Sequence, residues 1–386
     1  MTAVANSIFL SRGFRPFFLA AGLWSFFAMA FWIASINLDF SLPGQILPTY
    51  WHAHEMIFGY VAAVIVGFLL TAIPNWTGRL PVKGPPLAGL ALVWLAGRLA
   101  LLLSSFLPLW LVALVDVAFL WLVVLLILRE ILAGKNKRNL PVVAIVSALA
   151  LANTLFHLDR LSMIDAGSLS LRLGTSAVLV LITLIGGRVV PSFTRNWLAK
   201  RGEKNLPTQA NRFDLAAIFV TILSLVSWTV LEEGAMTGAL LVVAGILNFV
   251  RLVRWGAQKT LAEAMVWIMH LAYAWLALGM LLLGLAQFLD VLTFNSGLHA
   301  LTTGAIGTMT LGIMTRATLG HCGRELTADR ATITIYLVIT LAALCRVILP
   351  EFSDWAAFAY GASGFLWLAG FAIFVWHYGP MQLGRR

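Results

Sequence analysis

Long apolar stretches alternate with short polar breaks along almost the whole chain. About twelve stretches are long enough to cross a membrane as helices, since roughly 20 apolar residues span a bilayer. They are predicted at residues 16–37, 52–73, 86–104, 108–129, 141–158, 168–190, 214–231, 235–253, 263–289, 296–318, 330–349 and 354–377. The pattern therefore predicts an all-α, polytopic integral membrane protein that forms a single transmembrane domain over residues 1–386.

The composition agrees with this pattern and excludes several classes of protein. The chain has 386 residues, is 61% hydrophobic and only 11% charged, and has a mean hydropathy of +0.92. Soluble domains contain roughly 25% charged residues, so this chain has too little polar surface to coat a globule in water. A soluble enzyme, a disordered tail protein and a secreted disulfide scaffold are excluded, and the lipid bilayer is the expected environment.

The net charge of +10 would indicate a nucleic-acid partner in a soluble protein. In a membrane protein, Lys and Arg gather in cytoplasmic loops and report topology instead. With both termini in the cytoplasm, all but four of the 26 Lys and Arg residues fall on the cytoplasmic side. The exceptions are Arg98, Arg160, Arg172 and Arg346. We therefore predict cytoplasmic termini and no nucleic-acid partner.

A short pattern recurs at the ends of the second and sixth stretches. Both end in Pro-x-aromatic-Thr, at residues 74–77 and 191–194. The repetition after four helices suggests three pseudo-repeats of four helices each, in which the second, sixth and tenth stretches are equivalent.

Charged side chains inside the predicted spans are costly in lipid, so each is a candidate for function. Arg98 and Asp116 lie at similar depth in the third and fourth spans. Because these spans form a hairpin, the two residues are expected to pair as a structural salt bridge. A role in transport is the alternative.

Histidines are the more informative polar residues. The topology places four near the outer face, His52, His54, His157 and His299, and two toward the cytoplasm, His270 and His321. Four imidazoles that converge at one depth from three spans suit haem iron or copper. For each histidine alone, a hydrogen-bonded packing role is the alternative.

Helical geometry separates the two histidines of the second span. At 3.6 residues per turn, His52 is expected to share a face with Glu55, Met56 and Gly59, while His54 points away. One regular helix therefore cannot direct both at one ion. Gly59 would leave room for a flat macrocycle, and close helix packing is its alternative use.

The second predicted haem ligand is His299 in the tenth span. The small residues near it are Thr302, Thr303 and Gly304, with Ile306 on the same face. This surface could accept a haem edge. A haem held by His52 and His299 would bring its propionates near the outer interface, where Arg346 is the predicted charge partner. An ordinary interfacial arginine is the alternative.

Four segments resemble the NnrS family of bacterial inner-membrane proteins. They are FRPFF at 14–18, WHAHEM at 51–56, GGRVVP at 186–191 and TRATLGH at 315–321. The likeness extends from residue 12 to beyond residue 325. It implies a multi-pass inner-membrane protein that contains haem of the b type and copper and is associated with nitric oxide metabolism and resistance to nitrosative stress.

Two spans also resemble subunit I of haem–copper oxidases, more distantly. His52 stands where that family has a low-spin haem ligand, and residues 56–58 match the Met-Ile-Phe that follows it. His299 and residues 304–305 match the second His of a His-x-His motif and a later Gly-Ala pair. Gly297 stands where the high-spin haem ligand would be, and the sixth and seventh spans lack the copper-binding histidines. The resemblance implies a haem with two His ligands but not a proton-pumping oxygen reductase.

Copper would then need other ligands. The predicted pairs are His54 with His157 near the outer face, or His270 with His321 toward the cytoplasm. Glu55 is the candidate proton donor to the haem site.

Three functions remain open. The first is binding or turnover of nitric oxide, or a derived species, at a haem in the outer half of the membrane with copper nearby. No docking motif for an electron donor is apparent, so both redox catalysis and binding alone remain. The second is a transporter of copper, haem or a small metal–thiol complex. The third is a scaffold whose histidines only pack, which predicts a colourless protein.

Overall fold

The computed structural model describes residues 7–38, 40 and 44–385. All regular secondary structure in these residues is helical, which confirms the predicted all-α class. A helix satisfies its own backbone N–H and C=O groups, as a chain in lipid requires because no water is present to bind them. The chain divides into two compact units. Unit 1 comprises Met1–Ala177, Ala317–Gly323 and Phe371–Arg386, and unit 2 comprises Val178–Arg316 and Arg324–Gly370.

Eleven helices in the described part of the chain are long and apolar enough to cross a membrane. They coincide with the predicted stretches except the tenth. The tenth stretch is nevertheless continuously helical, as α13 (Phe294–His299), η7 (Ala300–Gly307) and α14 (Thr308–His321). Its many threonines and glycines lower its mean hydropathy. The structure therefore confirms a polytopic membrane protein with helix at every predicted stretch.

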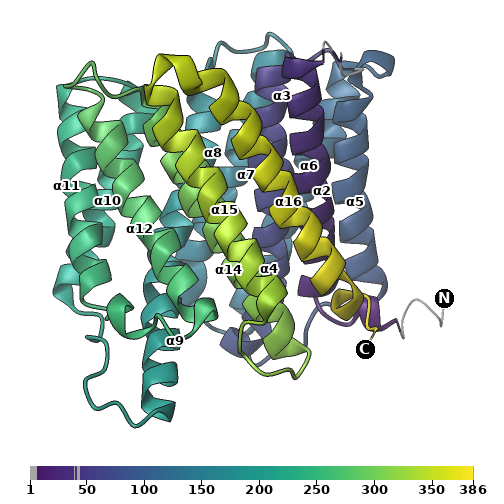
Figure 1. Ribbon diagram of the computed structural model, residues 1–386. Coiled ribbons are helices and arrows are strands. Elements are labelled where there is room, and N and C mark those ends of the chain that lie inside the picture. The colour runs from purple at the N-terminus through teal and green to yellow at the C-terminus, as the bar shows by residue number, and fades with distance from the viewer. Residues whose placement is uncertain (1–6, 39, 41–43, 386) are drawn as a thin grey trace. The chain divides into compact units, whose positions relative to one another are not determined.

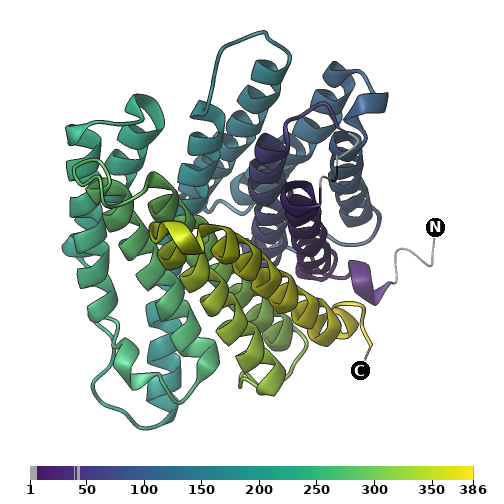
Figure 2. The same ribbon diagram turned by 45° about the horizontal axis from the view of Figure 1, so that its top comes forward.

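Neighbouring helices of unit 1 run side by side (Figures 1 and 2). They are α2 (Phe14–Asn37), α3 (Pro48–His54), α4 (Ala62–Thr77), α5 (Pro85–Leu102), α6 (Leu109–Ala133) and α7 (Leu140–Arg160). The central helix α6 packs against α4, α5 and α7. One end of α5, α6 and α7 therefore lies beside the start of the second span, where α3 leads into α4.

Unit 2 is built around α12 (Ala264–Leu285), which packs against α11, α13 and η7. The other helices are α9 (Gly187–Lys200), α10 (Arg212–Leu231), α11 (Ala235–Val253) and α15 (Arg330–Ile348). Three helices continue from one unit into the other: α8 (Leu169–Leu181), α14 and α16 (Ala356–Gln382).

Three of the spans contain a π-helical segment. These segments are η2 (Glu55–Val61), η5 (Ile182–Gly186) and η7, and they interrupt the second, sixth and tenth predicted stretches. A π segment widens the helical turn, shifts the angular position of the residues after it and is frequent at functional sites. Its recurrence in every fourth helix agrees with the predicted repetition of four-helix blocks.

Both ends of the described chain lie on the same side of unit 1. Arg15, in the first turn of α2, donates to the carbonyl oxygens of Met381 and Gln382 near the end of α16, at 2.8 and 3.1 Å. An even number of membrane crossings predicts this arrangement.

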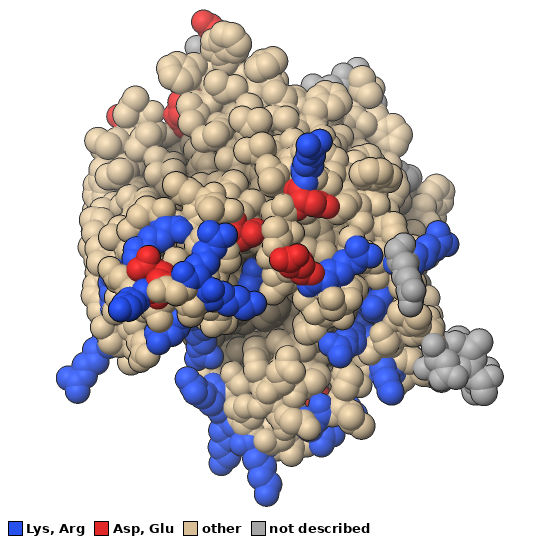
Figure 3. All heavy atoms as spheres, turned by 60° about the horizontal axis from the view of Figure 1, so that its bottom comes forward, with Lys and Arg blue, Asp and Glu red and all other residues tan. Residues whose placement is uncertain are grey.

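Lys and Arg side chains are numerous on the face shown in Figure 3, as expected of a cytoplasmic surface. The loop between α9 and α10 contains Arg201 and Lys204. In this loop, the backbone N–H of Asn205 donates to the Glu203 carboxylate, and Lys259 Nζ lies 3.6 Å from it. These contacts hold the pKa of Glu203 below its ordinary value.

Gly297 of α13 lies directly against the backbone of α12. A Cβ at this position would lie 2.6 Å from the backbone nitrogen of Leu283 and 2.7 Å from its Cα. Because backbone cannot move aside as a side-chain tip can, Gly297→Ala is expected to lower the free energy of unfolding by about 1–3 kcal/mol, the usual cost of overpacking. Thermal melting in detergent measures this. Gly361→Ala is the control, since a Cβ there would meet nothing within 4 Å, and equal melting of the two variants would contradict the prediction.

Candidate metal centre

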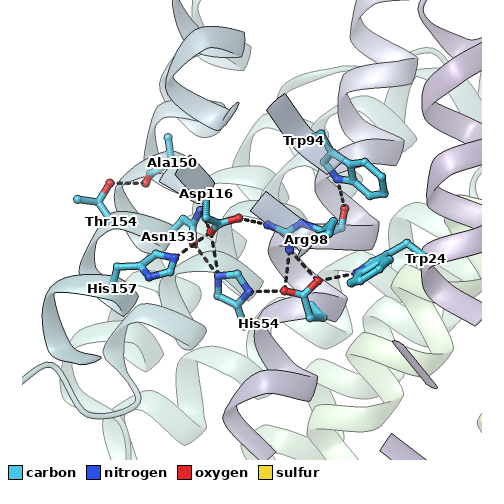
Figure 4. Close-up of polar contacts among 11 residues, drawn as sticks. Trp24, His54, Trp94, Arg98, Asp116, Ala150, Asn153, Thr154 and His157 are labelled. Carbon is cyan, nitrogen blue, oxygen red and sulfur yellow. Dashed lines mark hydrogen bonds and ion pairs between the residues drawn. The ribbon is translucent and has the colours of Figure 1, made fainter. Parts of the chain in front are cut away.

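A cluster of buried polar side chains lies at one end of α5, α6 and α7 in unit 1 (Figure 4). Its members are Trp24 of α2, His54 of α3, Glu55 of η2, Arg98 of α5, Asp116 of α6, and Asn153 and His157 of α7. Asn153 and His157 are four residues apart and so share one face of α7. Arg98 and Asp116 lie at matching depth because a short connection joins α5 to α6.

Arg98 is the centre of the ionic contacts. Its Nη1 donates to both oxygens of Glu55, each at 2.8 Å, and its Nη2 donates to Oδ1 of Asp116. The predicted pairing of Arg98 with Asp116 is confirmed. The guanidinium is 1% exposed and both carboxylates are at most 1% exposed, so Arg98 is the counterion of two buried carboxylates rather than one.

Glu55 is predicted on the His52 face, and both residues contact α2. Glu55 Oε2 accepts from Trp24 Nε1 at 2.5 Å, and His52 stacks on Trp32. Oε1 of Glu55 also lies 3.0 Å from His54 Nδ1, so the carboxylate links His54 to α2.

Gly59 leaves room for this cluster rather than for a macrocycle. A Cβ on Gly59 would lie 2.8 Å from Arg98 Nη1, from Glu55 Oε2 and from Trp24 Nε1. Its carbonyl oxygen, inside the π segment, accepts from Trp94 Nε1 at 3.0 Å. The expected haem space beside Gly59 is therefore not present.

Two imidazoles meet one carboxylate oxygen in the cluster. Oδ2 of Asp116 lies 2.9 Å from His157 Nε2 and 3.2 Å from His54 Nε2. The ligand atoms of these three residues all lie within 4.8 Å of one another, and all three residues are buried. Two imidazole nitrogens and a carboxylate oxygen form a donor set that binds copper, zinc or iron.

Asn153 orders these ligands. Its Nδ2 donates to Asp116 Oδ2 at 2.9 Å, and its Oδ1 lies 2.9 Å from His54 Nε2. The other nitrogen of His54 faces Glu55. Contacts of this kind hold the ring orientation of a ligating histidine and are normally required for affinity.

The cluster carries a net charge of its own. Glu55 and Asp116 contribute two negative charges and Arg98 contributes one positive charge, so with neutral imidazoles the sum is −1. A buried net charge is unfavourable in a medium of low dielectric constant. The group is therefore electrostatically prepared for a bound cation or for an additional proton on a histidine.

The two predicted haem ligands lie in different units, where each has defined contacts. His52, in unit 1, stacks on Trp32 with ring centroids 4.7 Å apart. In unit 2, His299 Nδ1 donates to the carbonyl oxygen of Asn295 at 2.8 Å, which leaves the ring's lone pair on Nε2, as a ligating histidine requires.

Two predictions near His299 concern Arg346 and the surface beside Gly304. Nη1 of Arg346 is buried and has no hydrogen-bond partner among the described residues, although the guanidinium stacks on Tyr360. Arg346 is on α15, which packs against α13. The small surface expected at Gly304 is filled, because a Cβ there would lie 2.7 Å from the indole ring of Trp275.

The alternative copper pair is assigned to separate units. In unit 2, Nε2 of His270 lies 2.7 Å from the hydroxyl of Thr194. In unit 1, Nδ1 of His321 accepts from Arg12 at 2.9 Å, and the ring stacks on Phe14. Neither histidine belongs to a group of metal-binding side chains among the described residues.

Unit 2 contains its own buried ionic group. Asp214 of α10 lies 3.1 Å from Arg251 Nε and 3.2 Å from Arg254 Nη1. Tyr273 accepts from Arg251 and donates to Asn248 Oδ1 at 2.6 Å. These contacts join α10, α11 and α12, and none of these residues belongs to a group of metal-binding side chains in the described part of the chain.

The sequence does not reveal the roles of three members of the unit 1 cluster. It does not single out Trp24 and Asn153, and it predicts Asp116 as a salt-bridge partner or a transport residue rather than as a metal ligand. The Asn-x-x-x-His spacing of residues 153 and 157 was the available signal, since it places an amide beside a candidate ligand on one helical face.

The sequence also matches a known protein family. The family model described as NnrS protein matches residues 8–386, which is nearly the whole chain. No curated protein matches the sequence at a significant level. This multi-pass membrane protein, with its buried His–Asp–His group, belongs to the NnrS family.

Proposed function

We propose that this protein holds a copper ion at His54, Asp116 and His157 and binds nitric oxide, or a derived species, in the bacterial inner membrane. The convergence of three ligand atoms inside unit 1 is the observation that carries the proposal. Imidazole nitrogens are ligands that suit copper. The NnrS resemblance implies the same metal.

We propose haem as the second group, with His52 in unit 1 and His299 in unit 2 each as a candidate iron ligand. The hydrogen bond from His299 Nδ1 supports this role, because it directs the lone pair to Nε2. The unpartnered Nη1 of Arg346 supports it further, since a buried donor needs an acceptor such as a haem propionate. When bound, haem iron and copper both provide sites for nitric oxide.

Glu55 and Arg98 orient the proposed ligands and balance part of their charge; no reaction is assigned to them. Glu55 accepts hydrogen bonds from Trp24 and Arg98 and faces His54, so its carboxylate holds the ring of a proposed ligand. Proton delivery by Glu55 stays a prediction. Binding of nitric oxide, which protects a cell under nitrosative stress by removing the free gas, is the function that these residues support; turnover would require an electron donor.

Metal analysis of the detergent-purified protein tests the copper site. His54→Ala and His157→Ala are each expected to lower copper affinity by more than about 100-fold, since even loss of a residue that only orients a ligand costs roughly 10–100-fold. His377→Ala, on α16, is the matched control and is expected to retain copper. Equal copper content in all variants would contradict the proposed site.

The buried charges of unit 1 also suit a transporter of copper, haem or a metal–thiol complex, because ionisable residues inside a membrane often mark a substrate pathway. Uptake of copper into proteoliposomes, abolished by His54→Ala, would support that alternative. Copper that remains bound in a constant ratio to protein supports the proposed function.

A further inference from the structure

We infer that Glu55 and Arg98 set the total charge of the metal centre so that it binds a singly charged ion, cuprous copper, more tightly than divalent ions. This inference rests on the proposed function, from which it takes the binding of copper by His54, Asp116 and His157. It concerns residues that do not themselves contact the ion.

The first argument is burial. His54, Glu55, Arg98 and Asp116 are at most 1% exposed, and His157 is 4% exposed. Charges in such an environment are weakly screened, so the free energy of the site depends strongly on its total charge.

The second argument is the charge count. Two carboxylates and one guanidinium give −1 with both imidazoles neutral, as ligation through their lone pairs requires. Addition of Cu⁺ brings the total to zero, whereas Cu²⁺ or Zn²⁺ leaves +1. Asp159 and Arg160, which follow His157 on α7, pair with each other and add no net charge.

The third argument is the number of available donors. Oδ1 of Asp116 accepts a hydrogen bond from Arg98, and its Oδ2 accepts one from Asn153. The carboxylate is thus a weakened ligand, and the two imidazole nitrogens remain the main donors. Zn²⁺ is held by four protein ligands in structural sites and by three plus a water in catalytic sites, whereas two imidazole nitrogens are enough for cuprous ion. The contact of His54 Nδ1 with Glu55 directs Nε2 toward the centre.

Competition with chelators tests the inference on the purified full-length protein. The affinities for Cu⁺ and Zn²⁺ are measured separately, and their ratio is compared between variants. Glu55→Gln removes one negative charge and is expected to lower the Cu⁺ affinity about tenfold or more, within the range found for residues around a ligand shell. Arg98→Gln adds one net negative charge and is expected to shift the ratio toward Zn²⁺ by a similar factor.

Two controls separate charge from packing. Trp24→Phe removes the hydrogen bond to Glu55 without changing the charge, and Arg98→Lys keeps the positive charge. Both are expected to retain the wild-type ratio of affinities. If Arg98→Gln does not fold, Glu55→Gln and the electron paramagnetic resonance spectrum of the wild type still test whether the site prefers Cu⁺ to divalent ions.

The wild-type protein loaded with copper is expected to give no cupric resonance signal under ascorbate and to bind Zn²⁺ at least tenfold more weakly than Cu⁺. A stable cupric signal under ascorbate, or an equal affinity for Zn²⁺, would overturn the inference while leaving the copper site in place. Absence of copper binding in either oxidation state would overturn the proposed function itself.

Discussion

Replacement of Arg98 by methionine is expected to lower the free energy of unfolding by about 3–5 kcal/mol, the range found when one partner of a buried ion pair is removed. Arg98 forms ion pairs with both Glu55 and Asp116 and offsets one of their two negative charges, and all three side chains are at most 1% exposed. Methionine fills a similar length of the cavity but leaves two carboxylates buried without a counterion. Thermal or denaturant unfolding in detergent measures the loss.

Arg160→Met is the matched control for this experiment. Arg160 pairs with Asp159, but its side chain is 26% exposed, and ion pairs near the surface contribute at most about 1 kcal/mol. Addition of Glu55→Gln to Arg98→Met is expected to restore part of the lost stability, because one buried negative charge is removed. Unfolding of Arg98→Met at the wild-type temperature would show that the carboxylates have another source of compensation.

Loss of haem is the largest expected effect of a single substitution. His299→Ala, like His52→Ala, is expected to abolish the sharp bands of the dithionite-reduced protein, because a haem with two His ligands loses an axial ligand in each variant. The optical spectrum and the haem content of purified protein measure this. Arg346→Met is expected to weaken haem retention less, since it removes only a charge partner of the propionates.

His270→Ala serves as the control for haem binding, because His270 contacts Thr194 and has no predicted axial role. It is expected to keep the reduced bands. A colourless wild-type protein from cells that make and insert haem would reject the haem assignment and favour packing or transport. Retention of the bands in both His52→Ala and His299→Ala would show that other residues bind the haem.

The helices and the class of the protein could be predicted from hydropathy alone. Each apolar stretch is helical because lipid provides no hydrogen-bond partners for the backbone. The pairing of Arg98 with Asp116 was also predictable, since a short connection fixes the relative depth of two adjacent spans. The π segments in the second, sixth and tenth stretches coincide with the suspected repeats, although no sequence pattern indicated their presence.

The side-chain environments were less predictable. A constant period of 3.6 residues does not predict the contact of Glu55 with His54, Trp24 and Arg98, which depends on how α2 and α5 pack against the second span. The open surface predicted beside Gly304 is filled by Trp275, and at Gly59 the structure shows the alternative prediction, close packing against side chains of other helices. A glycine in a helix indicates only that another group approaches the backbone closely. Which group this is depends on how the helices pack.

The sequence by itself therefore determined the membrane fold, the number of helical stretches and the list of candidate ligands. Only the tertiary structure decided that His54, Asp116 and His157 meet, and that Glu55, Arg98 and Asn153 surround them. Hydropathy and helical period are local properties that act on neighbouring residues. A metal centre instead requires side chains from separate helices to meet within a few ångströms, and their angular positions depend on helix packing and on the π segment that no local pattern encodes.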